Sequence, residues 1–220
     1  MVTKAAAKPK LRPRDRAKTE TAILDAVSRL ILRDGLSGVG INALAREAGV
    51  DKVLIYRYFG DLDGLYRAYA EHGDFWWSVE EMLSATEGAP NAAEALKRGL
   101  RHHAAAMRQR PVTLAVIAAE PANRTPLVVA LEEVREQRSL ELMRMEATRH
   151  GGWGDVDIAA VTALLAAAID YLAARALKIR VYGGVEIKTD KNWERVLAAV
   201  DAMIDGLFAN SASANRSRKP

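Results

Sequence analysis

The side chains with the clearest binding chemistry stand close together in residues 42–59, NALAREAGVDKVLIYRYF. Lys52, Tyr56, Arg57 and Tyr58 place two cations and two phenol hydroxyls in one short segment. Such groups donate hydrogen bonds to phosphate oxygens, and they fix the position of a protein on a nucleic-acid backbone. The segment therefore predicts contact with a polymer that carries phosphates.

Two short helices and a tight turn are expected to position these side chains. A helix over residues 41–48 ends at Gly49, which fits the left-handed residue that closes a helix. Asp51 is well placed to cap the next helix by accepting hydrogen bonds from its free N–H groups. This is the layout of a helix-turn-helix that recognises DNA. Lys52 and Tyr56 lie near one face of the second helix, where an ammonium and an exposed phenol suit two phosphates.

A longer helix over about residues 16–33 precedes this pair and completes a small domain. Its apolar residues recur at the 3.6-residue spacing of one helix face. Ala45 and Ala48 are small, which lets the second and third helices cross closely. We expect the three helices to share a core that contains Ile23, Val27, Leu30, Leu44, Ala48, Val50, Ile55 and Phe59.

From residue 16 to about residue 70 the chain resembles the TetR family of transcription regulators. The resemblance rests on AILDAVSRLILRDG, INALAREAGV, DKVLIYRYF and DLDGLYRAY, and its most specific part is AREAGV-x-K-x-x-x-Y-x-Y-F. It implies an all-α protein with an N-terminal three-helix helix-turn-helix domain and a C-terminal helical ligand-binding and dimerisation domain. It also implies a double-stranded DNA operator as partner, with repression as the usual outcome.

The resemblance assigns roles to residues on the turn and the third helix. At the matching positions Lys52, Tyr56 and Tyr58 would contact phosphates. Val53 and Leu54 would face bases, where apolar side chains can meet the methyl groups of thymine in the major groove.

Further residues near this segment have other expected roles. Asn42, at the start of the second helix, is another candidate for DNA contact. Arg57 either contacts DNA or pairs with Asp61 or Glu47, and Phe59 is expected in the core.

The chain departs from the family pattern at several positions. Val53 and Leu54 stand where Gly and Thr are common, Gly40 stands where Thr or Ser is common, and Leu62 stands where Lys is common. These differences leave the operator sequence open and suggest fewer backbone contacts from the fourth helix. The basic arm at the N-terminus is expected to compensate by non-specific attraction or by entering the minor groove.

Charge and composition narrow the class of protein. Residues 1–60 carry twelve Lys and Arg against six Asp and Glu, in a chain whose net charge is +4. A basic front end on a near-neutral body favours a polyanionic partner at that end, with a solubilising tail as the alternative. The chain has no Cys, which excludes disulfides, thiolate nucleophiles and Cys-based zinc sites.

Targeting and membrane signals are weak. The N-terminal residues lack the apolar run of a signal peptide. The longest apolar run, Ile158–Ile169, is too short and too rich in Ala to predict a membrane span. We therefore expect a soluble, cytoplasmic protein without a membrane partner.

Beyond the first domain the sequence predicts helices separated by Pro and Gly, with no strand of useful length. The expected division is a disordered basic arm over 1–15, the helix-turn-helix domain over 16–61, the effector-binding and dimerisation domain over 62–209 and a disordered tail over 210–220. The C-terminal helices are expected over about 62–83, 91–110, 111–120, 125–150, 156–181 and 192–209.

The resemblance implies an effector pocket among these helices and a homodimer through the last two of them. Alanine is frequent in 156–181, and small side chains let two helices approach closely, so this helix and 192–209 are expected to form the dimer seam. An internal core helix is the alternative. Two recognition helices about 34–36 Å apart would then meet successive major grooves.

The pocket candidates are large apolar residues and a few polar ones, and plain core packing is the alternative for each. Adjacent His102 and His103 point to different sides of a helix and do not form a metal clamp, so we expect no metal and no cofactor. The pocket candidates are Trp76, Trp77, Met82, His103, Met107, Ile117, Glu120, Met143 and Tyr171.

The sequence favours a regulator over an enzyme. It contains no Gly-rich phosphate loop, no HExxH and no visible nucleophile–base pattern. The expected function is a repressor that a small-molecule effector releases from a palindromic operator. The alternative is a ligand-independent architectural DNA-binding protein, which a filled C-terminal core would favour.

Overall fold

The computed structural model describes the backbone of residues 13–72 and 75–217 and the side chains of residues 16–72 and 75–211. Within these residues the chain forms ten α-helices and one two-stranded hairpin, which confirms the all-α class. The elements are α1 (Pro13–Asp34), η1 (Leu36–Gly38), α2 (Ile41–Ala48), α3 (Lys52–Phe59), α4 (Leu62–Glu71), α5 (Val79–Ala85), α6 (Ala92–Arg108), α7 (Pro111–Ala119), η2 (Glu120–Ala122), α8 (Pro126–His150), α9 (Ile158–Ala176), β1 (Val181–Tyr182), β2 (Val185–Glu186) and α10 (Asp190–Ser217).

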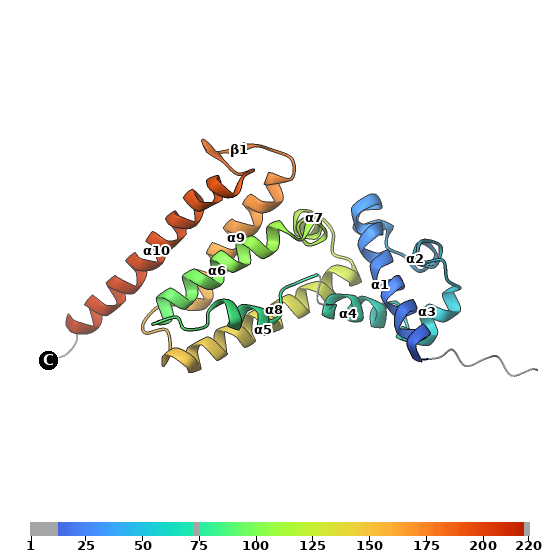
Figure 1. The fold of residues 1–220 in the computed structure, drawn as a ribbon, viewed down its shortest axis with the longest axis horizontal. Helices are drawn as coiled ribbons and strands as arrows, with labels where there is room; N and C mark the ends of the chain where they lie inside the picture. Colours follow the sequence, from blue (N-terminus) through green and yellow to red (C-terminus); the bar gives the residue numbers. More distant parts are fainter. Residues whose placement is uncertain (1–12, 73–74, 218–220) are drawn as a thin grey trace, which may run out of the picture.

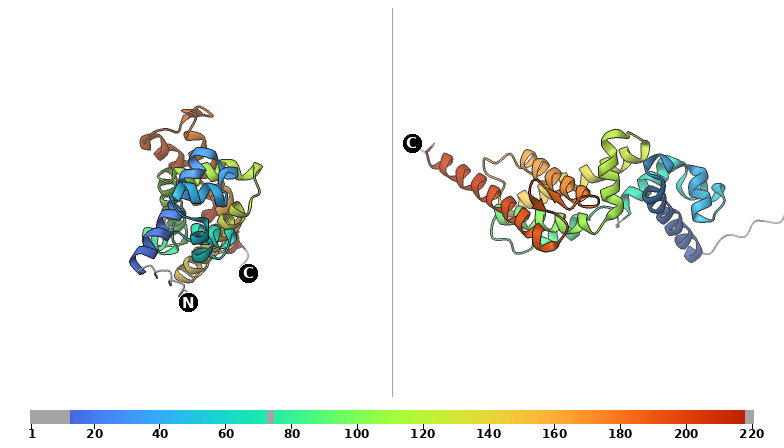
Figure 2. Two further views of the ribbon diagram at one scale, coloured as in Figure 1. Left: turned by 90° about the vertical axis from the view of Figure 1, so that its right-hand side faces the viewer. Right: turned by 90° about the horizontal axis from the view of Figure 1, so that it is seen from above.

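The molecule is elongated, with α1, α2 and α3 at one end and α10 at the other (Figure 1). Figure 2 shows the same arrangement from two further directions. Helix α4 packs against α1 and α3 on one side and against α8 on the other, and α1 also packs against α7. One contiguous cluster of buried apolar residues therefore runs through both parts of the chain, from Ile23 in α1 to Ile204 in α10.

The helix expected over about 62–83 is two helices in the structure, so that prediction was wrong. Helix α4 ends at Glu71, and α5 begins at Val79 after Ser78, whose side chain accepts a hydrogen bond from the backbone N–H of Glu81 at 3.0 Å. A Ser side chain that satisfies a free N–H group stabilises the start of a helix. The connecting segment carries Phe75, Trp76 and Trp77, all buried.

The helix expected over 156–181 ends at Ala176, and a hairpin follows where no strand was expected. Val181 pairs with Glu186 and Tyr182 pairs with Val185 around Gly183 and Gly184. Both glycines have positive φ, 54° and 77°, which is the backbone of the tight turn that joins two strands in short hairpins. The strands were missed because each has only two residues.

The two predicted disordered ends differ from the structure where it describes them. The arm predicted over 1–15 lies outside the described residues up to residue 12, and residues 13–15 form the first turn of α1, where Pro13 suits the first helical position. At the other end α10 continues past Ala209 to Ser217. Residues 210–217 contain neither Pro nor Gly, so nothing in their sequence ends the helix.

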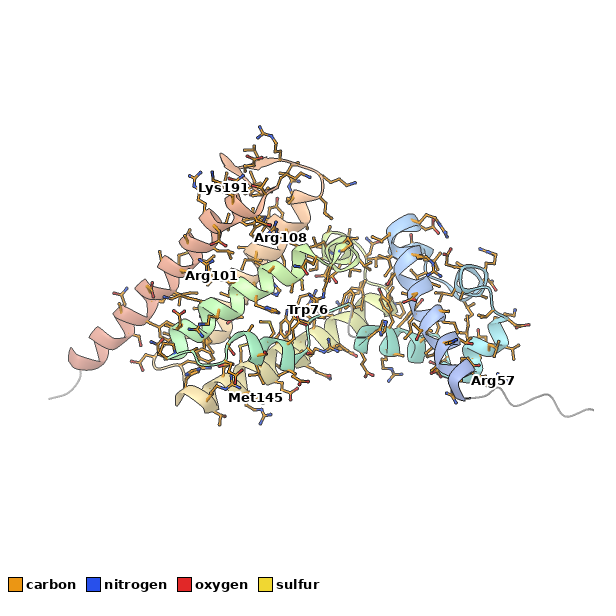
Figure 3. All side chains as sticks on the ribbon, in the orientation of Figure 1. Arg57, Trp76, Arg101, Arg108, Met145 and Lys191 are labelled. Carbon is orange, nitrogen blue, oxygen red and sulfur yellow. The ribbon has the colours of Figure 1, made fainter. Side chains whose placement is uncertain are left out.

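Helix α10 is held along α6 by an apolar stripe and by ion pairs. Trp193, Leu197, Val200 and Ile204 are buried at spacings of one helix face. Arg101 of α6 donates to carboxylates of α10, at 2.8 Å to Glu194 and 2.7 Å to Asp201. Figure 3 labels Arg101 and Arg108 on α6, beside α10.

Helix α9 leaves most of its surface uncovered. It packs against α6 and α7, but Leu164 is 73% exposed. Among the described helices it alone is long and apolar enough by itself to cross a membrane, by length and composition, and only 11% of the relevant window is buried. The helix therefore presents an apolar face that none of the described residues covers.

Candidate nucleic-acid interface

The turn between α2 and α3 has the local geometry that its sequence predicts. Gly49 closes α2 in the left-handed conformation, with φ of 67°. The side chain of Asp51 accepts a hydrogen bond from the backbone N–H of Val53 at 2.8 Å and so caps α3. Gly60 ends α3, and Asp61 caps α4 by accepting from the backbone N–H of Gly64 at 2.7 Å. These caps fix where α3 begins and ends.

Helices α2 and α3 are held together by packing against α1 and α4. Leu44 of α2 and Ile55 of α3 are fully buried, as are Ile23, Val27 and Leu30 of α1. These residues confirm the centre of the expected core.

Three other residues that were predicted in that core lie at its edge. Ala48, Val50 and Phe59 are partly buried and pack against it. The hydroxyl of Tyr66 donates to the carbonyl oxygen of Val39 at 2.7 Å, which ties α4 to the segment before α2.

Ion pairs that the sequence did not predict join α1 to α2. Arg29 Nε lies 2.7 Å from one carboxylate oxygen of Glu47, and Arg33 Nη1 lies 2.6 Å from the other. The hydrogen bonds from Arg29 and Arg33 hold the pKa of Glu47 below its usual value. Glu47 therefore forms ion pairs with Arg29 and Arg33 and not with Arg57. Spacing along α1 is a signal for this pair, because residues four apart share a helix face.

The predicted contact residues of α3 divide into an outer and an inner group. Lys52 and Arg57 are exposed, Val53 is 62% exposed and Tyr56 is 45% exposed, while Leu54 is half-buried. The exposed side of α3 therefore carries an apolar Val and a phenol beside two cations. Asn42 is also exposed, on α2.

Tyr58 is turned inward, unlike its predicted role as a phosphate contact. Its hydroxyl is buried and has no hydrogen-bond partner among the described residues. The guanidinium carbons of Arg16 and Arg57 lie 5.1 Å and 5.3 Å from the centre of its ring. The ring therefore holds two cations beside α3, and one of them comes from the start of α1. Figure 3 places Arg57 at this end of the molecule.

Most of the predicted pocket residues form packed core. Trp76, Trp77, Met82, His103 and Met107 are each at most 4% exposed. Ile117, Glu120 and Met143 are partly buried. Tyr171 does not join them, because it lies on the surface of α9, 48% exposed, with its ring against Tyr182 of the hairpin.

Polar contacts connect this core to its neighbours. Trp77 Nε1 donates to His103 Nδ1 at 2.9 Å, and His103 Nε2 lies 2.8 Å from a carboxylate oxygen of Asp170 on α9. Arg138 of α8 donates to the carbonyl oxygens of Trp76 and Trp77 at 3.0 and 3.2 Å. Burial lowers the pKa of Arg138, against a smaller opposing effect of Glu71. Sequence reasoning missed Asp170 and Arg138, because nothing local pairs them with residues so far away in the chain.

Two hollows lie elsewhere on the surface of the described structure. One, of about 440 Å³, is an open groove between α5 and α8 that includes Leu83 and Met145. The other, of about 220 Å³, lies between α1, the end of α4 and the turn from α6 to α7, and includes Ser28 and Val112. None of the nine predicted pocket residues lines either hollow.

The described residues contain no group of three or more His, Asp or Glu that could hold a metal ion. His102 lies 2.8 Å from Glu81, and His103 is bonded to Asp170, so the two adjacent histidines face different partners. The arrangement as a whole offers an exposed cationic and phenolic surface at one end and a packed aromatic core in the middle.

Comparison with known proteins bears on the first of these features. Residues 23–69 match the family model described as bacterial regulatory proteins, tetR family. Over 86 residues the chain is 34% identical to the HTH-type transcriptional regulator BetI of Burkholderia thailandensis. That match covers 38% of this chain and 43% of the relative, so less than half of the relative is aligned.

Solved structures extend the likeness in fold over nearly the whole chain. The fatty acid degradation regulator FadR from Bacillus halodurans superposes with a TM-score of 0.62 at 20% identity, covering 89% of this chain and 96% of that one. FadR from Bacillus subtilis, in complex with stearoyl-CoA, superposes with a TM-score of 0.57 at 17% identity, covering 86% and 96%. At these identities the likeness concerns the fold alone.

Proposed function

We propose that this chain, whose N-terminal domain identifies it as a member of the TetR family, is a DNA-binding transcription regulator. The observation that carries the proposal is the division of α3 into two sides. Ile55 is fully buried, whereas Lys52, Val53 and Tyr56 are exposed together. A short helix that is capped, anchored by one face and cationic on the other is suited to the major groove.

The exposed residues have separate roles in this proposal. Lys52 and Tyr56 contact phosphates and set the register of the protein on DNA. Val53 and Leu54 meet thymine methyl groups, and Arg57 adds a further cation.

Asn42 on α2 is a further contact in the proposal. Tyr58 acts differently from the other candidates, because its ring positions Arg16 and Arg57 beside the groove.

The proposal includes a homodimer through α9 and α10. The apolar face of α9 around Leu164 and the exposed Met203 and Leu207 of α10, 58% and 40% exposed, need a cover. A second copy suits this face better than lipid does, because the other side of α9 is already packed and carries Asp170 bonded to His103. Two copies related by a two-fold axis would bind a palindromic operator in the cytoplasm.

Repression relieved by a small-molecule effector is the proposed mode of regulation. Helix α4 contacts the DNA-binding unit and α8, and Arg138 of α8 donates to the carbonyl oxygen of Glu71, the last residue of α4, at 3.1 Å. A shift of α8 would therefore move α4 and change the spacing of the two α3 helices. A coupling of about 1–3 kcal/mol would change operator affinity about 5- to 150-fold.

A ligand-independent architectural DNA-binding protein is the second candidate. It is favoured by one observation: most of the predicted pocket residues are buried in packed core, and none of the nine lines either hollow. Operator affinity that no small molecule changes would support this candidate.

Selection of bound fragments from a random DNA pool tests the proposed function. The full-length protein is expected to enrich an imperfect palindrome and to bind it with a steep salt dependence. A matched selection with Lys52→Ala, Tyr56→Phe protein is expected to enrich the palindrome weakly. Enrichment of no sequence by the unaltered protein would contradict the proposal.

A further inference from the structure

Trp76 lies in the middle of the C-terminal domain and is 2% exposed (Figure 3). The centre of its indole lies 5.5 Å from that of Trp77 and 5.6 Å from that of His103. Its Nε1 atom is buried and donates to no acceptor among the described residues. A buried N–H group without an acceptor is costly, and folded proteins contain few of them.

The polar atoms around Trp76 are engaged, which sets its N–H group apart. Both ring nitrogens of His103 have partners, since Nδ1 accepts from Trp77 and Nε2 is bonded to Asp170. The carbonyl oxygen of Trp76 accepts from Arg138 at 3.0 Å. His103 therefore has no free ring nitrogen that could accept a hydrogen bond from Trp76 Nε1.

A cation stands over the same indole ring. The guanidinium carbon of Arg135, on α8, lies 5.8 Å from the ring centre of Trp76. Arg135 Nη1 donates to both carboxylate oxygens of Glu120, at 3.2 and 3.1 Å. The side chains of Arg135 and Glu120 are 25% and 23% exposed, so this ion pair borders solvent while the ring beside it does not.

Glu120 is the part of this cluster that can move most easily. It follows the last residue of α7, where its backbone N–H donates to the carbonyl oxygen of Val116, and it begins the three-residue turn η2. Its carboxylate can leave Arg135 for solvent without breaking the hydrogen bonds of a helix interior. Its departure would uncover the guanidinium of Arg135, which lies over the indole ring of Trp76.

We propose that this cluster binds small carboxylic acids with an apolar body, and its regulatory meaning rests on the proposed function. The carboxylate of the ligand replaces that of Glu120 on Arg135 and accepts the hydrogen bond of Trp76 Nε1. The guanidinium carbon lies 5.8 Å from the ring centre, so Arg135 and the indole of Trp76 are close enough to contact one small ligand.

The exchange selects for a negative charge. One carboxylate replaces another on Arg135, so its charge stays balanced, and the buried N–H group gains an acceptor. An amine of the same shape would face Arg135 as a like charge. An amide can accept from the indole, but its contact with the guanidinium is neutral and weaker.

The packing of the core limits the ligand to a small body. Trp77 is buried against Trp76, and packed interiors contain few voids that could receive a large molecule. Entry therefore requires Glu120 and η2 to move, and the ligand binds a conformation that the free protein visits.

The test uses the full-length protein without DNA and two probes, benzoate and hexanoate, with benzamide and benzylamine as controls of matched shape. Binding is measured by calorimetry and by the shift of the indole N–H resonances in ¹⁵N-labelled protein. We expect at least one of the two acids to bind at concentrations up to about 1 mM, and to move the Trp76 resonance most. Binding of neither acid would overturn the proposal, as would equal binding of benzamide.

Three variants test whether Trp76, Arg135 and Glu120 bind the acid or only support the fold. Trp76→Phe keeps the aromatic ring and removes the N–H group, and Arg135→Gln removes the cation; each is expected to weaken binding about tenfold or more. Glu120→Gln removes the competing carboxylate and is expected to tighten binding several-fold, which a purely structural role would not produce. Trp153→Phe is the matched control and is expected to bind the acid unchanged. Unaltered binding by Trp76→Phe, or no gain from Glu120→Gln, would contradict the site.

Operator affinity is measured separately, with and without the acid. Acid binding that leaves operator affinity unchanged would support the site and contradict effector-controlled regulation. Loss of operator affinity on addition of the acid would support both the acid-binding site and effector-controlled regulation. A protein that binds the acid but no DNA would contradict the proposed function alone.

Discussion

The exposed face of α3 and the buried cluster around Trp76 both collect hydrogen-bond donors, but they present them to different surroundings. On α3, Lys52 and Tyr56 face solvent, so a partner adds contacts without removing any. Around Trp76, Arg135 is already paired with Glu120, so a ligand must displace a contact of the chain. Binding at α3 should therefore depend on salt, whereas binding at Trp76 should depend on competition with one carboxylate.

The largest expected effect tests whether the region around α3 and the region around Trp76 unfold separately. Ile55→Ala removes a fully buried side chain from the DNA-binding unit and is expected to cost about 2–5 kcal/mol of folding free energy. Operator binding should be lost while the C-terminal helices still melt near the temperature of the unaltered protein. Gel-shift titration with operator DNA measures the binding, and thermal unfolding followed by circular dichroism measures the melting.

The matched change in the other region is Ile169→Ala, at a side chain of α9 that is 1% exposed. It should lower the melting temperature of the C-terminal domain and leave the fold of α1 to α3 in place. If both variants lowered a single transition by the same amount, the contiguous core would act as one cooperative unit, and the comparison between two regions would fail.

The next effect concerns the exposed apolar face of α9, which lies outside both the α3 surface and the cluster around Trp76. Leu164→Lys replaces an apolar residue of α9 that is 73% exposed by a charged one, and it is expected to shift the protein from dimer to monomer, because a buried unpaired charge opposes association. Analytical ultracentrifugation measures the change. Lys191→Ala, at an exposed residue of α10, is the control and should leave the dimer intact.

A smaller effect tests the salt-dependent character of α3. Lys52→Ala is expected to weaken operator binding about tenfold and to reduce the slope of log affinity against log salt by about one. Fluorescence anisotropy with labelled operator DNA at several salt concentrations gives both values. An affinity loss with no change of slope would mean that Lys52 supports the fold of the unit and does not contact a phosphate.

The difference between the two regions also explains what the sequence could predict. The turn at Gly49, the cap at Asp51 and the helices α2 and α3 depend on residues within a few positions of one another. Local spacing was therefore sufficient for them.

The cluster around Trp76 depends on contacts across long stretches of chain. Trp77 meets His103 and His103 meets Asp170, 26 and 67 positions apart, and Arg138 reaches Trp76 over 62 positions. No spacing pattern encodes such contacts. The sequence could name Trp76 and His103 as candidates, but it could not pair them.

Tyr56 and Tyr58 give a finer test on one helix. Both phenols were predicted to contact phosphates, but Tyr56 is 45% exposed while the hydroxyl of Tyr58 is buried without a partner among the described residues. Tyr56→Phe is expected to weaken operator binding several-fold. Tyr58→Phe removes an unsatisfied buried hydroxyl and is expected to leave binding unchanged and stability equal or higher by up to about 1 kcal/mol.

Gel-shift titrations and melting curves for the two Phe variants decide between the roles. Weaker binding by the Tyr58 variant, with unchanged stability, would mean that the hydroxyl turns outward when DNA binds. The sequence could not distinguish the two residues, because Tyr58 packs against the shared core and against Arg16 at the distant start of α1, contacts that local spacing does not encode.

The smallest expected effect lies in the link between α1 and α2. Hydrogen bonds from Arg29 and Arg33 lower the pKa of Glu47 below its ordinary value of 4.5. A carboxyl group whose pKa is lowered by folding stabilises the protein above the pKa of the unfolded chain, and this contribution is lost as the pH falls through the folded value. Glu47→Gln should therefore melt slightly lower than the unaltered protein at pH 7, and the gap should close as the pH falls below 4.5 and through the lowered pKa of Glu47.

Melting temperatures of both proteins between pH 7 and pH 3 measure this gap, with Glu136→Gln, at an exposed residue of α8, as the control. High salt should narrow the gap at pH 7, because the pairs lie at the surface. A gap that stays constant across the pH range would mean that Glu47 acts through its packing against α1 and not through its charge. In that case α2 would be held by its apolar face alone, as Leu44 already suggests by its complete burial.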